Sequence, residues 1–341
     1  RSDTSSALLE VLDGEQNSHF VDHYIDMPVD LSEILFIATA NDLSEVSRPL
    51  LDRMEIIEVS SYTKNEKLHI AKEHLVAKQL KKNGLTKKSV RFTDKALAKI
   101  IDGYTMEAGV RELERMIAAV LRKVVRKNYT VGGVNIEKQI VITDKNLSEY
   151  LGKVKFIKEK ASRKNEVGIV RGLAWTAAGG DTLEIEVNVL GGKPELILTG
   201  NMGDVMRESA QIALSYVRSV VRKNQIFEEN AIHIHIPEGA VPKDGPSAGI
   251  TMATAIYSAV TGKPVDASTA MTGEVTLRGR VMPIGGLKEK LLAAKTAGLK
   301  RVLVPLENKS DVEELEEEIV QGLEIVYVSD MKEVLKLAIV K

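Results

Sequence analysis

The sequence predicts a multidomain protein of the α/β and α+β classes. At 341 residues the chain is long enough for two or three domains with their own cores. Its first part holds one near-continuous apolar strand, its middle part is dominated by helical periodicity, and its last part alternates strands with helices. These three segments give the expected domain order.

The first sixty residues begin with a helical pattern from Ser6 to Asp13. The apolar run 34–40 follows, and such a run is typical of a parallel strand covered on both faces. It ends at Asn41, and the segment from Pro49 to Ile57 comes next. This part is expected to be a piece of an α/β domain.

Residues 62–127 are expected to be rich in helix. One apolar stripe runs through Val110, Leu113, Ile117, Val120 and Val124, and Arg111 lies off it. Two short β patterns, 90–92 and 140–142, are expected to pair with each other. The polar, basic stretch 152–164 then predicts an interdomain linker.

From about Asn165 the chain predicts a compact α+β domain. Residues 182–189 alternate polar and apolar side chains as a half-buried strand does. Asp204 is placed to cap the helix that follows it. Further strands are expected at 196–199, 301–304 and 325–328, with a buried helix over 248–260, a Glu-rich helix after 304 and an amphipathic helix at the end.

Composition excludes several classes of function. The chain carries 47 Lys+Arg against 48 Asp+Glu, so nucleic acid is not indicated as the main partner. It has no cysteine, which rules out disulfides, thiolate metal sites and cysteine nucleophiles. No apolar run approaches the ~20 residues of a membrane helix, and no signal peptide opens the chain. We expect a soluble, cytoplasmic protein.

The segment around Ser247 matches the G-x-S-x-G pattern of a nucleophile elbow, Gly245-Pro246-Ser247-Ala248-Gly249. Alone, the match also fits ordinary turn chemistry before a helix. In hydrolases with this pattern the histidine follows the serine, yet here the last histidine is His235, upstream. If Ser247 is a nucleophile, its base is therefore another residue type, and lysine is the documented substitute.

The candidate base is Lys290, in the helical segment that follows Gly285-Gly286. It falls inside the apolar stripe formed by Leu287, Leu291 and Ala294, whereas Lys288 falls outside and is expected to be solvated. For an isolated lysine in such a stripe, snorkelling to a surface carboxylate is the plainer reading. Lowering its pKa to near 7.4 requires ~3 units, or ~4 kcal/mol, which burial can supply.

Three long motifs resemble those of the Lon ATP-dependent serine proteases. They are the runs from His233 to Gly249, from Met271 to Gly279 and from Pro283 to Lys290. The resemblance covers essentially the whole chain. It implies a dyad of Ser247 and Lys290, the lysine that the helical periodicity also selects. It further implies that Thr272 holds the lysine in line and that Asp244 is an acidic position close to the serine.

The resemblance also implies the domain organisation. Residues 1–60 are the C-terminal part of an AAA+ α/β subdomain, 61–151 the helical AAA+ lid, 152–164 the linker and 165–341 the Lon-type α+β proteolytic domain. Asn41 matches sensor 1, Arg53 the arginine finger and Arg111 sensor 2. Without the resemblance these three read as a strand-end cap, a surface ion pair and a solvated helix arginine.

The preferred function is an ATP-dependent endopeptidase that degrades unfolded or regulatory proteins through an acyl-enzyme and self-associates into a ring, as a homohexamer. No G-x-x-x-x-G-K-[ST] motif occurs, so no cofactor is expected on this chain, whereas ATP and Mg²⁺ are expected in the full-length protein. The alternative is a catalytically silent Lon-like binding or assembly module. No metal site is expected. Asp244 either orients Lys290 or closes an Asx-turn, and His233 and His235 either pack in the sheet or imitate a metal pair.

Overall fold

The computed structural model divides into two compact units, residues 1–60 and 61–341, each described here by itself. Residues 3–340 are described except 23, 25, 41, 42, 44, 45, 58, 131, 132, 157–163, 177, 178, 222–224 and 238–242.

The first unit contains little regular structure. Its elements are helix α1 (Asp3–Val11), a 3₁₀ turn (Asn17–His19), strands β1 (Phe20–Asp22) and β2 (Met27–Val29), and helix α2 (Arg48–Leu51). The predicted first helix is confirmed by α1, whereas the predicted strand over 34–40 is wrong. Those residues form no strand and are exposed, since no described strand lies beside them to pair with their backbone.

The second unit begins with a helical part whose core is continuous. It comprises α3 (Lys64–Ile70), a π-helical turn (Ala71–Leu75), α4 (Val76–Lys82), β3 (Val90–Phe92), α5 (Asp94–Gly103), α6 (Arg111–Lys127), β4 (Tyr129–Thr130), β5 (Gly133–Val134), β6 (Ile140–Ile142) and α7 (Leu147–Leu151). The stripe predicted on α6 is confirmed, since Leu113, Ile117, Val120 and Val124 are fully buried. The predicted pairing is also confirmed: β3 and β6 are parallel, with Arg91 opposite Val141.

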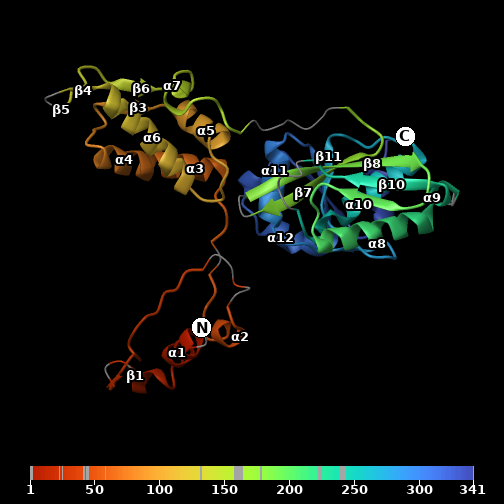
Figure 1. The fold of residues 1–341 in the computed structure, drawn as a ribbon, viewed down its shortest axis with the longest axis horizontal. Helices are drawn as coiled ribbons and strands as arrows, with labels where there is room; N and C mark the ends of the chain where they lie inside the picture. Colours follow the sequence, from red (N-terminus) through yellow and green to blue (C-terminus); the bar gives the residue numbers. More distant parts are fainter. Residues whose placement is uncertain are drawn as a thin grey trace. The chain divides into compact units, whose positions relative to one another are not determined.

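The C-terminal part is built on a seven-stranded mixed sheet, of which Figure 1 labels β7, β8, β10 and β11. The strand order is β15-β14-β11-β7-β8-β10-β9. The strands are β7 (Ile169–Thr176), β8 (Gly179–Gly191), β9 (Leu196–Thr199), β10 (Asn230–His235), β11 (Thr269–Met271), β14 (Arg301–Pro305) and β15 (Glu324–Val328). A small hairpin, β12 (Glu274–Val275) with β13 (Val281–Met282), follows β11. The strands predicted at 182–189, 196–199, 301–304 and 325–328 are confirmed.

Helices cover both faces of this sheet. The helices are α8 (Asp204–Val220), α9 (Gln225–Glu228), α10 (Gly249–Thr261), α11 (Leu287–Thr296), α12 (Lys309–Glu313), α13 (Glu317–Val320) and α14 (Met331–Ala338). Side chains of α8, α10 and α14 share one core with Ile185, Ile234 and Leu303. Side chains of α11, α12 and α13 share a second core with Leu173 and Val302. Neighbouring strand residues such as Val302 and Leu303 thus serve opposite faces.

Two details differ from the sequence-based expectations. The predicted Glu-rich helix is two short helices, α12 and α13, because Leu315 and Glu316 interrupt it. Asp204 is not the cap of α8: the N-cap is Gly203, and the Met206 amide bonds instead to the Asp244 carboxylate at 2.9 Å. A long-range partner therefore replaces the local one that the sequence favours.

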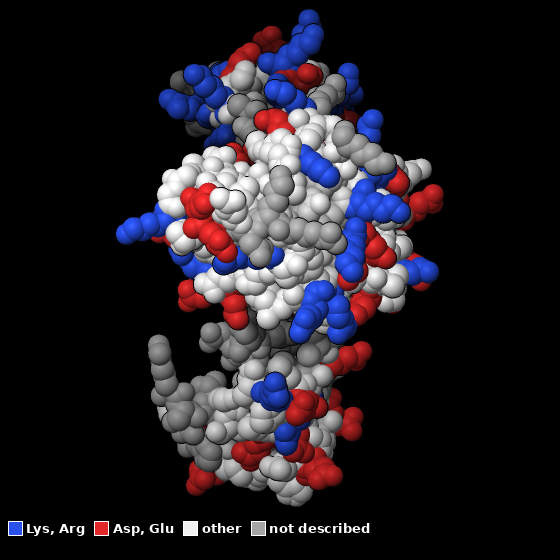
Figure 2. Space-filling model, turned by 90° about the vertical axis from the view of Figure 1, so that its right-hand side faces the viewer, with Lys and Arg blue, Asp and Glu red and all other residues white. Residues whose placement is uncertain are grey.

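The surface agrees with the balanced composition. On the face shown in Figure 2, acidic and basic side chains are interspersed and do not form a field of one sign. Among the described residues, every helix is too short or too polar to traverse a lipid bilayer.

Candidate active site

Ser247 lies in a 3₁₀ turn, Pro246–Ala248, that leads directly into α10. Its side chain is half-buried, while the helix behind it is buried almost throughout. Gly245, just before the turn, has φ = +117°, a conformation that L side chains rarely adopt. The pattern Gly-Pro-Ser therefore fixes the serine at a helix N-terminus, as the sequence predicts.

The turn is tied to the end of β11 by its own backbone. The Gly273 amide donates to the Ser247 carbonyl at 2.8 Å, and the Ile250 amide donates to the Gly273 carbonyl at 3.1 Å. The Thr272 hydroxyl donates to the same Ser247 carbonyl at 3.4 Å, and Thr272 is fully buried. The predicted supporting residue Thr272 thus contacts the serine segment directly.

Asp244 has a structural partner. Its carboxylate accepts from the Met206 amide at 2.9 Å and from the Gly245 amide at 2.9 Å. The first bond satisfies an N-terminal amide of α8, and Gly203 leaves the room for it, since a Cβ there would lie 2.4 Å from the Asp244 carboxyl carbon. Both contacts are with backbone amides. They therefore favour the alternative in which Asp244 closes the turn before Ser247 over the one in which it orients Lys290.

Lys290 lies on the buried face of α11 and is 3 % exposed. Burial lowers the pKa of its ammonium group from 10.5 to about 8, and the neighbouring Glu289 carboxylate opposes that shift only in part. Its side chain makes no hydrogen bond or ion pair with the residues that the structure describes. A lysine in this state is partly neutral near pH 8 and is able to accept a proton.

Strand β7 is the common neighbour of the two candidate catalytic residues. Strand β11 stops at Met271, opposite Gly172 of β7, so Thr272 and the serine turn bonded to it follow at that level. The turn and α11 both contact β7. The Glu289 carbonyl lies against Gly180, the residue paired with Trp175, so closely that a Cβ at Gly180 would be 1.8 Å from it. The serine turn and the helix that bears Lys290 therefore both pack against β7.

The sequence predicts that Lys288 is solvated, but the structure shows that its side chain is mostly buried. Its side chain is 16 % exposed and its ammonium nitrogen lies 3.9 Å from a carboxylate oxygen of Glu316. The prediction is wrong because α13 covers this side of α11, a contact between segments that helical periodicity does not reveal. The two lysines still differ in environment, because Lys288 has a carboxylate partner and Lys290 is buried in an apolar core.

The two histidines of β10 bind the same hydroxyl group. His233 Nε2 lies 2.9 Å and His235 Nδ1 2.8 Å from the Thr199 Oγ1 on neighbouring β9. The packing and hydrogen-bonding reading of these residues in the sheet is thereby confirmed.

Of the three residues matched to nucleotide functions, the structure describes Arg53 and Arg111. Asn41 is outside the described residues. Arg53 forms an ion pair with Asp13 at 3.0 Å and donates to the Pro49 carbonyl. Arg111 begins α6 and is exposed. Their nucleotide roles remain predictions.

Sequence reasoning missed three features of the site. They are the Gly273 amide on the serine turn, the Asp244–Met206 bond and the close approach of α11 to Gly180. Each joins segments far apart in the chain. The sequence does contain one signal for the bond from the Gly273 amide, namely the run Met271-Thr272-Gly273 within the second motif.

Comparisons with known proteins identify the family of the matched segments. A family model of the Lon protease (S16) C-terminal proteolytic domain matches residues 141–341, and one of the Lon protease AAA+ ATPase lid domain matches residues 81–133. Proteins called Lon protease from Lachnoclostridium phytofermentans and Bacillus thuringiensis are 58 % and 56 % identical over all of this chain. Lon protease 1 of Bacillus subtilis is 54 % identical, also over the whole chain.

The chain spans less than half the length of these relatives, namely 47 %, 43 % and 44 %. The matches support the prediction of a serine peptidase, since the matched domain is the proteolytic one. On these matches, the chain belongs to the Lon protease family and contains its lid and proteolytic domains.

Proposed function

We propose that this chain is the peptidase part of an ATP-dependent serine endopeptidase that cuts unfolded proteins with a Ser247–Lys290 dyad. The observation that carries the proposal is Lys290: it is buried, its pKa is lowered to about 8, and its helix packs against β7, the strand that the Ser247 turn also contacts. A neutral lysine near a serine hydroxyl supplies the base that the missing downstream histidine would otherwise provide.

The proposed reaction is acyl transfer. Neutral Lys290 accepts the proton of Ser247 as Oγ bonds to the carbonyl carbon of the substrate peptide, and the carbonyl electron pair moves onto its oxygen. When the tetrahedral intermediate collapses, the C–N bond breaks and the protonated Lys290 returns the proton to the leaving amine. Water then attacks the acyl-enzyme with the same lysine as base and restores Ser247.

The turn restricts which amides could stabilise the oxyanion. The Gly249 amide bonds to the Pro246 carbonyl and the Ile250 amide to the Gly273 carbonyl. Donors from this turn therefore have to precede them, as the Ser247 and Ala248 amides do. Their place at the start of α10 adds the positive end of the helix dipole.

Strand β7 supplies a place for an extended substrate. It pairs with β8 from Ile169 to Thr176, but with β11 only at Arg171 and Gly172. From Leu173 onward, the edge facing β11 has no strand partner among the described residues. A substrate strand paired there lies beside the serine turn, and Trp175, which is 61 % exposed, borders the same stretch.

In this proposal, ATP is bound and hydrolysed by the full-length protein and not by this chain alone. Because the chain lacks the phosphate-binding motif, we expect no ATP hydrolysis by it, and only short or unfolded substrates are expected to be cut. Arg53 as an arginine finger, Asn41 and Arg111 as sensors, and a hexameric ring belong to the same proposal. Cytoplasmic residence is expected too.

Degradation of a fluorescein-labelled unfolded protein tests the dyad. Wild type is expected to release labelled peptides, and Ser247→Ala is expected to release none. Ser310→Ala, at an exposed serine of α12, is the matched control and should behave as wild type. Equal cleavage by Ser247→Ala would reject the dyad. No cleavage by any of the three proteins would favour the alternative, a silent Lon-like binding module.

A further inference from the structure

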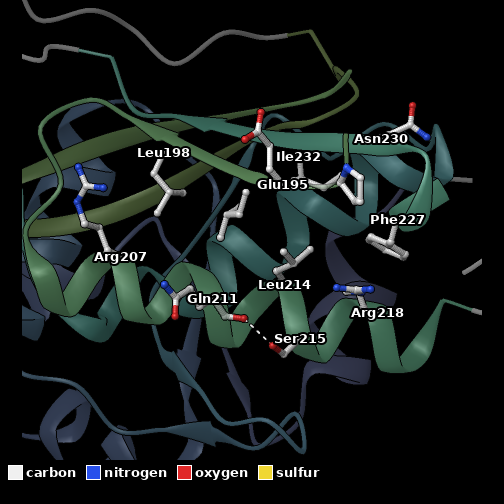
Figure 3. A pocket seen from close by; sticks show the side chains of 12 residues that line it. Glu195, Leu198, Arg207, Gln211, Leu214, Ser215, Arg218, Phe227, Asn230 and Ile232 are labelled. Carbon is white, nitrogen blue, oxygen red and sulfur yellow. Dashed lines mark hydrogen bonds between the residues drawn. The ribbon is translucent and has the colours of Figure 1, made fainter. Parts of the chain in front are cut away.

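A groove with a volume of about 540 Å³ lies along the edge of the sheet, between α8 and the outermost strand β9 (Figure 3). The lower wall is one face of α8, which presents Arg207, Gln211, Leu214 and Arg218 at helical spacing. The upper wall is β9 with the start of β10. None of its lining residues belongs to the candidate active site.

The floor of the groove is apolar and incompletely covered. Leu196 and Leu198 stand in register with Ile232 and Ile234 of β10 and so point to the same side of the sheet, toward α8. Ile234 is fully buried, whereas both leucines, like Leu214 across the groove, remain half-buried. The outer edge of β9 has no strand partner in the described part of the chain. A strand added at this edge would cover the exposed parts of Leu196, Leu198 and Leu214.

Two arginines mark the ends of the groove. Arg207 and Arg218 are eleven positions apart on α8, or about 16 Å along the helix axis. The Arg207 Nε donates to the Met202 carbonyl at 3.0 Å, and Arg218 lies over the Phe227 ring, 5.7 Å from its centre. Neither guanidinium forms an ion pair with a described carboxylate. Both guanidinium groups therefore lack a counter-charge among the described residues.

We propose that this groove binds an extended segment of a partner protein that carries two carboxylates four residues apart with an apolar residue midway, acid-x-apolar-x-acid. Four residues of strand span about 13 Å, and the flexible arginine side chains bridge the remainder. The middle side chain enters the apolar floor beside Leu214. Because strand side chains alternate, all three point to α8 while the backbone pairs with β9.

The rim of the groove sets a further condition on the ligand. Glu195, exposed directly before β9, adds a carboxylate that repels a uniformly acidic segment. The pattern therefore requires uncharged residues between the two acids. Binding of such a segment does not depend on the Ser247–Lys290 dyad.

Fluorescence anisotropy with a synthetic peptide tests the proposal. The probe is a fluorescein-labelled decapeptide with the core Glu-Thr-Val-Thr-Glu, titrated with the Ser247→Ala chain so that peptidase activity does not consume it. Arg207→Glu and Arg218→Glu are each expected to weaken binding about tenfold. Arg122→Glu, the same change on the exposed face of α6, should leave binding unchanged. Circular dichroism shows whether each variant is folded.

Charge exchange makes the test specific. A peptide with lysine in place of one glutamate should bind Arg207→Glu or Arg218→Glu better than the original probe does, and a peptide of glutamates throughout should bind wild type more weakly. Equal binding by all variants, or no rescue by the lysine peptide, overturns the proposal. A change in sedimentation coefficient for Arg207→Glu without a change in peptide affinity assigns the groove to contact between copies of this chain, which overturns it as well.

Discussion

The amide of Gly273 donates a hydrogen bond of 2.8 Å to the carbonyl of Ser247, which joins the end of β11 to the turn that bears the candidate nucleophile. A second hydrogen bond joins Gly273 to α10, because the Ile250 amide donates to the Gly273 carbonyl. Strand and helix therefore hold the serine between them. Its position depends on the sheet as much as on its own turn.

Thr272→Val removes the hydroxyl that reinforces this connection. Stability should fall by less than about 1 kcal/mol, since the Ser247 carbonyl keeps the Gly273 amide. We expect kcat to fall about tenfold, or ~1.4 kcal/mol, with KM little changed, because the serine turn loses a constraint on its position. Steady-state kinetics on a short fluorogenic peptide measures both parameters. Thr272→Ser keeps the hydroxyl and should restore kcat. If the role of Thr272 is purely structural, Thr272→Val will lower the thermal unfolding temperature and leave kcat/KM unchanged.

Substitutions of the two lysines of α11, Lys288 and Lys290, should have different effects on peptidase activity. Lys290→Ala should abolish turnover because it removes the proposed base, and Lys290→Arg should too, since guanidinium stays protonated. Lys288→Ala loses a pair with Glu316 at 3.9 Å, a partly exposed contact worth little. Peptide cleavage by the three variants decides the assignment. An inactive Lys288→Ala together with an active Lys290→Ala contradicts it.

The rate of cleavage should depend on the protonation state of Lys290. Burial lowers its pKa to about 8, so the fraction of neutral lysine rises roughly tenfold per pH unit below that value and levels off above it. We expect kcat/KM to follow this curve between pH 6 and 10. A profile with its midpoint near 10.5, the value of an unburied lysine, would show that this side chain is not the titrating base.

Lys290 should also cost the protein stability at neutral pH. Its pKa is about 8 in the folded chain and near 10.5 in the unfolded chain, so the unfolded state holds the proton more tightly. Its contribution is most unfavourable below pH 8 and disappears as pH rises toward 10.5. Lys290→Met should therefore be more stable than wild type at pH 7 by about 3 kcal/mol, with the difference narrowing by pH 10. Urea unfolding at both pH values measures it, and a constant difference would contradict the linkage.

Asp244 should act through the start of α8. Asp244→Ala removes the acceptor of the Met206 amide and is expected to cost about 1 kcal/mol, as the loss of a helix cap does. Asp244→Asn retains an oxygen acceptor and should cost less. Thermal unfolding compares the two. If Asp244 instead orients the base, both variants will lower kcat and shift the pH profile without a matching loss of stability.

The sequence was informative wherever structure is dictated locally. The buried face of α11, the turn before α10 and the strands at 182–189 and 196–199 follow from periodicity and turn chemistry. It failed where long-range contacts decide. The apolar run 34–40 forms no strand because no described neighbour covers it, Asp204 is displaced by Asp244, and Lys288 is covered by α13. Periodicity identifies a face, but it does not say what lies against that face.

Gly180 has a consequence for how variants of this protein are interpreted. The residue carries no reactive group, yet a single added methyl would collide with the Glu289 carbonyl and push aside the helix that holds Lys290. A sequence with both members of the dyad intact and alanine at this position would pass inspection by motif and still encode a misaligned site. In surveys of natural variation, a substitution at this glycine is therefore expected to impair the site although both proposed catalytic residues are present.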